Sequence, residues 1–408
     1  MSHLDGRPQG ILLSTYADVR SALFNRDLLQ AAHRDYEKGN IIEGVVMQLD
    51  GDPHRERRRL ENPLFRRETL TYYESEVFPG VIDRLLGSLV VDGTGDLVEI
   101  GQVLTVVLSA RISGIDLDPS DLDAIRDVVR LTHVFTQGTS ITDSSRPKAD
   151  VIADVQLALG SFERRYYAKS RERRLDRHRG GVGGEDDLLD RLLRAQAELG
   201  MDDATVLRET AFFLESGAVT SSLTLINTLD LLFSDPELLT SIRATVAESS
   251  RGEALEAIQR CVHEALRLNP IIPLMRRRAR ISTRVGEQEI PEGELVLLDI
   301  INANRDQSVF GGDADVFDPW RVPDSGVPLF GLSFGGGAHA CIGQVLAGGL
   351  EQRGRSAPDA AERKFGQVAL MAYALMAAQV RPHSVRPPEL DPSTRRRRFE
   401  HYFVEMSL

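Results

Sequence analysis

The chain has 408 residues, of which 42% are hydrophobic, and a formal net charge of −12. The acidic balance argues against nonspecific binding to nucleic acid, because phosphates repel an acidic surface, and no run of about 18 apolar residues is present that would span a membrane. Two cysteines, Cys261 and Cys341, exclude a disulfide framework, and the N-terminus lacks the layout of a signal peptide, so we expect a soluble cytoplasmic protein.

The first predicted elements are a strand at Ile11–Thr15 and a helix at Asp18–Leu23. A mostly irregular segment follows, and a new helix should begin at Asp52-Pro53, because both residues suit a first helical turn. His54 and Arg58 lie four residues apart on that helix and share one face. They could bind one anionic group together, or they could belong to a solvated basic helix.

From Leu97 to Leu193 the apolar spacing is mainly helical. The longest predicted helix runs from Asp203 to Phe233, and its roughly thirty residues at ~1.5 Å each would cross the whole molecule. Gly217 and Thr220 lie midway. A glycine beside hydroxyl residues weakens a helix and can open a groove, although a helix threonine more commonly bonds its own turn.

Glu264 and Arg267 form an i,i+3 pair on a helix that Pro270 ends, which by itself is an ordinary surface feature. Alternating segments then predict a small β region with a turn at Pro291–Gly293. We expect a single domain over residues 1–408, with β structure around 1–30, 271–325 and 380–408.

The most informative stretch is Phe334-Gly-Gly-Gly-Ala-His-Ala-Cys-Ile-Gly343. A phosphate loop would need Gly-Lys-Ser/Thr after the glycines. A zinc site from His339, Cys341, Cys261 and His263 is disfavoured, because residues i and i+2 on a helix point to different faces. Two interpretations remain open: an inert buried cysteine in a glycine-rich turn, and a thiolate ligand for haem iron at the start of a helix.

The ordered motifs resemble the cytochrome P450 family of haem-thiolate monooxygenases. Its Phe-x-x-Gly-x-x-x-Cys-x-Gly pattern is matched from Phe334 to Gly343, its Glu-x-x-Arg motif by Glu264 and Arg267, and the segment that supplies a further arginine by Phe317–Arg321. The resemblance extends from about Gly10 to the C-terminus. It implies a mainly α fold with a smaller β region, a long central helix over haem b, and a front that is shorter than usual.

The resemblance also implies roles for single residues. Cys341 would be the axial ligand of the iron, and Glu264, Arg267 and Arg321 would form a structural network. Gly217 would make room for dioxygen and Thr220 would help to deliver protons. The other cofactor-binding residues would be His54, Arg58, Arg277 (with Arg276 as the alternative register), Phe334, Gly335, His339 and Gly343. The substrate pocket would include Val45, Met47, Ala218, Ile272, Leu274 and Tyr402.

The sequence departs from the family at two places. The acid that usually precedes the threonine is replaced by Val219, which cannot relay protons, and Glu215 lies one turn earlier on the same helix face. Glu215 could substitute for it, but we expect a core-edge glutamate in a salt bridge. The last long helix is interrupted around residues 348–364, which we interpret as an inserted loop.

The implied function is oxidation, with O₂ and two electrons, of a small apolar biosynthetic intermediate, either free or tethered to a carrier protein. A ferredoxin-type donor and its reductase would supply the electrons, and a basic patch could steer an acidic donor. Val219 keeps open a variant that uses peroxide or that couples or desaturates its substrate. A non-catalytic haem protein that binds a ligand is the alternative from another class. The patch comprises Arg55, Arg57, Arg59, Arg66 and Arg67.

Overall fold

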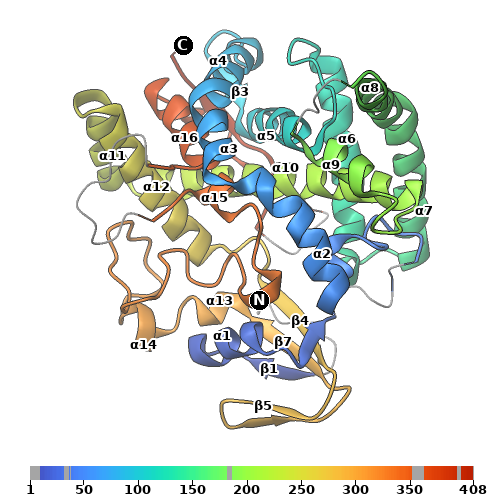
Figure 1. Cartoon of the computed structure of the whole chain (residues 1–408). Helices are drawn as coiled ribbons and strands as arrows, with labels where there is room; N and C mark the ends of the chain where they lie inside the picture. Colours follow the sequence, from blue (N-terminus) through green and yellow to red (C-terminus); the bar gives the residue numbers. More distant parts are fainter. Residues whose placement is uncertain are drawn as a thin grey trace.

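The computed structural model describes residues 10–31, 36, 38–181, 186–351, 363–392 and 397–407. The chain is mainly α-helical with a smaller β region, as predicted, and the strands between residues 274 and 299 lie below most of the helices in Figure 1. The predicted shortened front and most of the predicted insertion involve residues 1–9 and 352–362, which lie outside the described residues. No helix in the described ranges has the length and hydropathy needed to cross a bilayer.

The helices and strands have the following bounds. The α-helices are α1 (Tyr16–Phe24), α2 (Gly51–Glu61), α3 (Arg67–Tyr72), α4 (Phe78–Leu89), α5 (Leu97–Ser113), α6 (Leu122–Thr139), α7 (Lys148–Phe162), α8 (Ala168–Arg179), α9 (Leu188–Ala195), α10 (Asp203–Phe233), α11 (Pro236–Glu248), α12 (Arg251–Leu268), α13 (Ile300–Ala303), α14 (Gln307–Phe310), α15 (Gln344–Gly348) and α16 (Gln367–Ala377). The strands are β1 (Ile11–Leu13), β2 (Leu28–Gln30), β3 (Thr94–Asp96), β4 (Leu274–Ala279), β5 (Thr283–Val285), β6 (Gln288–Ile290), β7 (Leu295–Asp299), β8 (Arg381–Pro382), β9 (Glu389–Leu390), β10 (Phe399–His401) and β11 (Phe403–Glu405).

Helix α10 has the bounds that the sequence predicts and is 31 residues long. It begins where the Asp202 carboxylate accepts a hydrogen bond from the Thr205 N–H at 2.7 Å, which satisfies one of the free N–H groups of the first turn. In Figure 1 it crosses the middle of the molecule, with other helices on either side of it. Residues along it can therefore line the interior from one side to the other.

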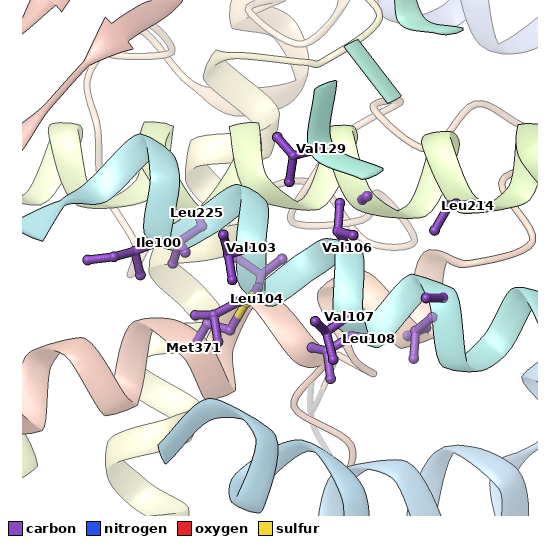
Figure 2. Close-up of a cluster of buried hydrophobic side chains, with 14 of the residues drawn as sticks. Ile100, Val103, Leu104, Val106, Val107, Leu108, Val129, Leu214, Leu225 and Met371 are labelled. Atoms are coloured by element: carbon purple, nitrogen blue, oxygen red, sulfur yellow. The ribbon is translucent and has the colours of Figure 1, made fainter. Parts of the chain in front are cut away.

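The core is built around α5, which is apolar on nearly all sides, as expected of a helix enclosed by others. Figure 2 shows its side chains, including Leu104 and Val106, between α10, with Leu214 and Leu225, and α16, with Met371. All of these side chains are buried. This packing fixes the middle of α10 against the rest of the helical body.

The largest sheet has the strand order β1-β7-β4-β2, with β1 parallel to β7 and the other neighbours antiparallel. Strand β4 is an inner strand and carries Arg276 and Arg277. Strand β3 pairs with β11, which also pairs with β8, and two hairpins (β5–β6 and β9–β10) complete the β structure. Residues 300–325, which we expected within the β region, form two short helices and turns instead.

The last long helix is interrupted at the predicted place, since α15 ends at Gly348 and α16 begins at Gln367. The Gln259 amide donates to the carbonyl oxygens of Gly348 at 2.9 Å and Lys364 at 3.0 Å. The Glu74 carboxylate accepts from the N–H of Gly366 at 2.8 Å. Both sides of the interruption are thus anchored to helical segments of the main body.

Candidate functional site

The cysteine loop (residues 334–343) is closed by a hydrogen bond from the N–H of Cys341 to the carbonyl oxygen of Phe334 at 2.9 Å. Gly337 has a φ of 65°, in the left-handed region that favours glycine. A Cβ atom there would stand 2.3 Å from the carbonyl oxygen of Leu23. The glycine therefore lets the loop pack directly on the backbone of α1.

The Cys341 side chain is accessible to solvent, yet it lies deep enough that burial raises the pKa of its thiol. A hydrogen bond from the backbone N–H of Gly343 and the charge of Arg58 act in the opposite direction. We expected a helix terminus to favour the thiolate, but α15 is only five residues long and begins at Gln344. The sulfur is thus accessible although protein surrounds it, and a cation bound beside it would favour the deprotonated form.

Basic and imidazole side chains surround the cysteine loop. The rings of His54 and His339 are 4.3 Å apart, and His339 Nε2 is 3.2 Å from Asp50 Oδ1. An Arg58 guanidinium nitrogen donates to the carbonyl oxygen of Ala340 at 3.2 Å. Burial, followed by the charges of His339 and Arg58, lowers the pKa of His54 to about 4. The structure therefore brings His54, Arg58 and His339 together at the loop.

The structure also distinguishes Arg277 from Arg276. Arg277 is buried and donates to Gln30 Oε1 at 2.8 Å and to the carbonyl oxygen of Arg276. Burial lowers its pKa to about 10, with Asp50 acting in the opposite direction. Arg276 instead forms an ion pair with Asp143 at 3.0 Å. Within the described residues, both hydrogen-bond acceptors of Arg277 are neutral oxygens, so this guanidinium favours an added carboxylate.

One face of α10 is incompletely covered although the helix crosses the interior. Between positions 212 and 227 its half-buried residues recur at three- and four-residue intervals, so they form a single stripe. We call the space beside this stripe the α10 recess. The stripe consists of Phe212, Phe213, Ser216, Gly217, Thr220, Leu223 and Asn227.

The Thr220 hydroxyl donates to the carbonyl oxygen of Ser216 at 2.6 Å, which is the common bonding of a helix threonine to its own turn. A Cβ atom on Gly217 would stand 2.7 Å from the Ser109 hydroxyl oxygen on α5. The absence of a side chain at Gly217 therefore has a packing reason of its own. Both residues nevertheless lie on the stripe that faces the recess.

Within the part of the chain that the structure describes, Glu215 does not form the salt bridge that we expected. Its Oε1 accepts hydrogen bonds from the hydroxyls of Thr136 at 3.0 Å and Thr139 at 3.2 Å, both on α6. Its Oε2 accepts from the Ser216 hydroxyl at 3.2 Å. Burial raises the pKa of the Glu215 carboxyl to about 7, against the effect of these three donors. Helix packing thus surrounds the acid with hydroxyls, which the sequence of α10 alone does not reveal.

The residues predicted for the substrate pocket do not lie in one environment. Val45 and Ala218 are buried in the main core, Met47 and Leu274 are half-buried, and Ile272 is 45% exposed. Tyr402 is buried at the far end of α10, where its hydroxyl lies 3.5 Å from Asp230. Asp230 is ten residues beyond Thr220, or about 15 Å along the helix.

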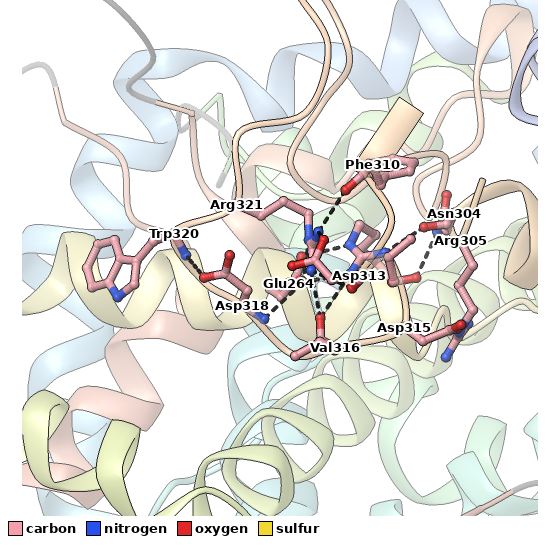
Figure 3. A network of polar contacts seen from close by, with 12 residues as sticks. Glu264, Asn304, Arg305, Phe310, Asp313, Asp315, Val316, Asp318, Trp320 and Arg321 are labelled. Atoms are coloured by element: carbon pink, nitrogen blue, oxygen red, sulfur yellow. Dashed lines mark hydrogen bonds and ion pairs between the residues drawn. The ribbon is translucent and has the colours of Figure 1, made fainter. Parts of the chain in front are cut away.

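Glu264, Arg267 and Arg321 form a buried network (Figure 3). Arg267 makes two hydrogen bonds of 2.7 Å to the Glu264 carboxylate and donates to the carbonyl oxygens of Asn304 and Ala314. Arg321 Nε lies 3.2 Å from the same carboxylate. The network joins α12 to the chain between α13 and the cysteine loop, so it holds the region from which the loop emerges.

Phe334 and Gly335 shape the start of the cysteine loop. The Phe334 ring packs edge-on against Phe330, with centroids 4.9 Å apart, and Gly335 has a φ of 68°. Sequence reasoning missed Gln30, which accepts a hydrogen bond from Arg277, and Asp50, which contacts His339. The sequence offers one signal, which is the position of Asp50 directly before α2. In the structure the Asp50 side chain makes no capping bond there.

The residues present fit a haem. Such a cofactor needs one axial thiolate, partners for its propionates and space for its ring, and the chain offers the accessible thiol of Cys341, the cluster of His54, Arg58 and Arg277, and the α10 recess. In the part of the chain that the structure describes, no three His, Cys, Asp or Glu side chains converge as a zinc site would require. His263 Nε2 instead lies 2.7 Å from the carbonyl oxygen of Gly348.

The comparisons with known proteins point to one family. Residues 161–348 match the family model described as Cytochrome P450. The chain is 27% identical over 335 residues to cyclomarin C epoxidase CymV of Salinispora arenicola, with 82% of this chain and 77% of the relative covered. It is 28% identical over 337 residues to erythromycin C-12 hydroxylase of Saccharopolyspora erythraea, with coverages of 81% and 77%.

Solved structures show the same fold. The crystal structure of CalO2 matches with a TM-score of 0.75 at 21% identity, covering 97% of this chain and 90% of that one. P450BioI in complex with an acyl carrier protein matches with a TM-score of 0.71 at 18% identity, covering 97% and 92%. The family model, the relatives and the fold agree with the order of the motifs, and the chain belongs to the cytochrome P450 family of haem-containing monooxygenases.

Proposed function

We propose that this protein oxidises a small apolar biosynthetic intermediate, with Cys341 as the axial ligand of haem b. The observation that carries the proposal is the Cys341 thiol, which is accessible although protein surrounds it, receives a hydrogen bond from Gly343 and lies beside the charge of Arg58. When bound, the haem supplies the activation of dioxygen that lets one oxygen atom be inserted into the substrate. The protein's residues bind and orient the reactants around it.

We assign the propionate-binding role to His54, Arg58 and Arg277. Arg277 is the most informative of the three, because the hydrogen-bond acceptors of its buried guanidinium among the described residues are both neutral. His339 and Asp50 would position His54 through the ring contact and the 3.2 Å interaction described above. Gly343 would tune the thiolate by its N–H, since donors to a ligand sulfur lower its basicity.

On the substrate side, Thr220 and Gly217 would face the reacting groups from α10, and Leu274 and Met47 would contribute apolar contacts. Two of the relatives, cyclomarin C epoxidase CymV and erythromycin C-12 hydroxylase, support by their names a biosynthetic intermediate as substrate. The complex of P450BioI with an acyl carrier protein supports the version of the proposal in which a carrier protein presents the substrate.

A separate ferredoxin-type donor and its reductase would supply the electrons to this cytoplasmic, single-domain enzyme. Arg55, Arg59, Arg66 and Arg67 are exposed and would form the basic docking patch. Arg57, which we first counted in that patch, is buried and pairs with Glu209 on α10. It is therefore left out of the docking surface.

The ligand assignment is tested by the carbon monoxide difference spectrum of the reduced protein. The wild-type chain should bind haem and give the carbonyl band of thiolate ligation, and Cys341→Ser should lose that band. Cys261→Ser is the matched control, because Cys261 is buried in the core and should leave the spectrum unchanged. A thiolate-type spectrum in Cys341→Ser would remove the basis of the proposal.

A second candidate is the peroxide-using variant, which is favoured by one observation: Val219 is buried and carries no titratable group. Turnover with peroxide alone should be compared with turnover driven by reductase and ferredoxin on the same substrate. Faster product formation with peroxide would favour the variant. Formation of no product under aerobic, reducing conditions, despite substrate binding, would favour a non-catalytic ligand-binding protein.

A further inference from the structure

Monooxygenation consumes protons, and the α10 recess must receive them. One oxygen atom enters the substrate, and the other leaves as water with two electrons and two protons, so RH + O₂ + 2e⁻ + 2H⁺ gives ROH + H₂O. Val219 cannot carry a proton. The hydroxyls on the recess-facing stripe belong to Ser216 and Thr220, and a hydroxyl can pass a proton on only when an acid supplies one.

The Glu215 carboxyl is that acid by its position. Its Oε1 accepts from two hydroxyls, those of Thr136 and Thr139, whereas the one hydrogen-bond donor that Oε2 has among the described residues is the hydroxyl of Ser216. When the carboxyl is protonated, the proton therefore belongs on Oε2, which lies beside a side chain on the recess stripe. The carbonyl oxygen of the same Ser216 accepts the hydroxyl of Thr220 at 2.6 Å.

The surroundings of Glu215 keep both of its protonation states accessible near neutral pH. Burial raises its pKa to about 7, and the interactions that oppose burial come from three neutral hydroxyls. One turn before Thr136 on α6 lies His133, whose pKa is lowered to about 4 by burial and then by Arg398. His133 is therefore neutral in the pH range where Glu215 titrates, so the His133 side chain adds no positive charge to the surroundings of Glu215.

We propose that Glu215 and Ser216 form the proton-donating pair of this enzyme, with Ser216 as the group that faces the reactants and Glu215 acting through it. The inference rests on the oxygenase reaction proposed above. Glu215 passes its Oε2 proton to Ser216 Oγ while the Ser216 hydroxyl proton moves into the recess. The resulting carboxylate regains a proton through the hydroxyls on its other side, which belong to the half-buried residues Thr136 and Thr139.

A structural role alone would be a crosslink between α6 and α10, and Glu215→Gln separates the two roles. The glutamine side-chain oxygen can still accept from Thr136 and Thr139, but it has no carboxylic proton to give. Ser216→Ala removes the path to the recess and leaves the crosslink intact. Asp230→Asn is the matched control, because Asp230 is another buried carboxyl of α10 with a pKa raised by burial, and it lies far along the helix.

The first readout is infrared absorption of the ferric, substrate-free holoenzyme. The wild type should show a protonated carboxyl band that shifts in D₂O and titrates near pH 7, and Glu215→Gln should lose it. Ser216→Ala should keep the band at a shifted frequency, because one hydrogen-bond partner is gone. The absence of any band that depends on Glu215 at pH 6 would overturn the proposal.

The second readout is the fraction of consumed electrons that appears in product. We expect this fraction to fall tenfold or more in both Glu215→Gln and Ser216→Ala. Their substrate affinity and their thiolate-type carbonyl spectrum should stay unchanged. Asp230→Asn should behave as the wild type does. Wild-type efficiency in Glu215→Gln would overturn the role of the acid, and a loss in Glu215→Gln without one in Ser216→Ala would overturn the route. A wild-type chain that forms no product would refute the oxygenase function instead, and the infrared titration would still test Glu215.

Discussion

Gly217 of α10 lies directly against Ser109 of α5, so that a Cβ atom on the glycine would stand 2.7 Å from the serine hydroxyl oxygen. Real Cβ contacts are essentially never that short. The close approach of the two central helices therefore depends on the missing side chain. Gly217 also lies on the recess stripe, so one residue meets a packing demand and borders the α10 recess.

The first prediction concerns this contact. Gly217→Ala should lower the free energy of unfolding by about 1–3 kcal/mol, because overpacking a well-filled core has that cost, and urea denaturation measures it. Adding Ser109→Ala should restore most of the loss, since the crowded hydroxyl is removed. Gly87→Ala on α4 is the control, because no atom lies within 4 Å of its added Cβ, and it should stabilise by about 0.5–1 kcal/mol. Equal stabilities of Gly217→Ala and the wild type would contradict the packing argument.

The second prediction concerns Arg267, which is fully buried and satisfies Glu264 with two hydrogen bonds of 2.7 Å. Arg267→Ala removes both of these hydrogen bonds and leaves Arg321, at 3.2 Å, as the charged partner of the buried Glu264 carboxylate. Breaking a buried ion pair on one side costs about 3–5 kcal/mol, a large part of an ordinary domain's stability. We expect a sharp drop in the soluble yield and in the melting temperature. Arg251→Ala, an exposed change at the first turn of the same helix, should leave both near the wild-type values.

The third prediction concerns pH. The folded-state pKa of Glu215 is about 7, above its ordinary value of 4.5, so the folded protein holds a proton that the unfolded chain releases between these values. The stability contributed by this proton is complete below about pH 4.5 and is lost as the pH rises through 7. At about 1.4 kcal/mol per pKa unit, the loss amounts to roughly 3 kcal/mol.

Glu215→Gln does not titrate, so its free energy of unfolding relative to that of the wild type should rise by about that amount from pH 4.5 to pH 8. Urea unfolding at a series of pH values measures the difference, and taking the difference removes the effects of carboxylates elsewhere in the chain. A difference that stays constant with pH would show that the carboxyl titrates in the folded protein as it does in the unfolded chain.

The features that the sequence predicts best are those set by local patterns. The bounds of α10 follow from the length of the stretch with helical apolar spacing and from its cap, Asp202. The cysteine loop follows from its glycines. The surroundings of Glu215 could not be predicted, because Thr136 and Thr139 belong to another helix whose packing angle no local pattern specifies. The ends of the interrupted last helix are held by Gln259 in the same way, by contacts between segments far apart in the chain.

The choice between Arg276 and Arg277 shows the same limit at the scale of one residue. Sequence spacing leaves open by one position which arginine corresponds to the family's propionate-binding residue. Pairing of β4 with β7 and β2 fixes the register, and the side chains of Arg276 and Arg277 then leave β4 in different directions. Arg277 turns to Gln30 and Arg276 to Asp143. Tertiary pairing therefore decides which arginine is available to a propionate.

The last prediction uses that pairing. Asp143 follows α6, whose Thr136 and Thr139 contact α10, and Arg276 lies on β4, after a segment in which Ile272 is exposed and residues 273–275 are half-buried. Their ion pair thus ties the chain just after α6 to β4, and we expect it to restrain one route to the α10 recess. Asp143 is 37% exposed, so the pair is worth at most about 1 kcal/mol. Asp143→Asn should shift the equilibrium toward separation of the two elements and speed imidazole binding to the ferric protein by about two- to fivefold.

Stopped-flow absorbance measures the rate of imidazole binding. High salt screens the ion pair, so the rate in the wild type should then rise toward that of Asp143→Asn. Arg278→Ala, an exposed change on the same strand, should have the wild-type rate, and identical rates in Asp143→Asn and wild type at low salt would show that the pair does not limit entry.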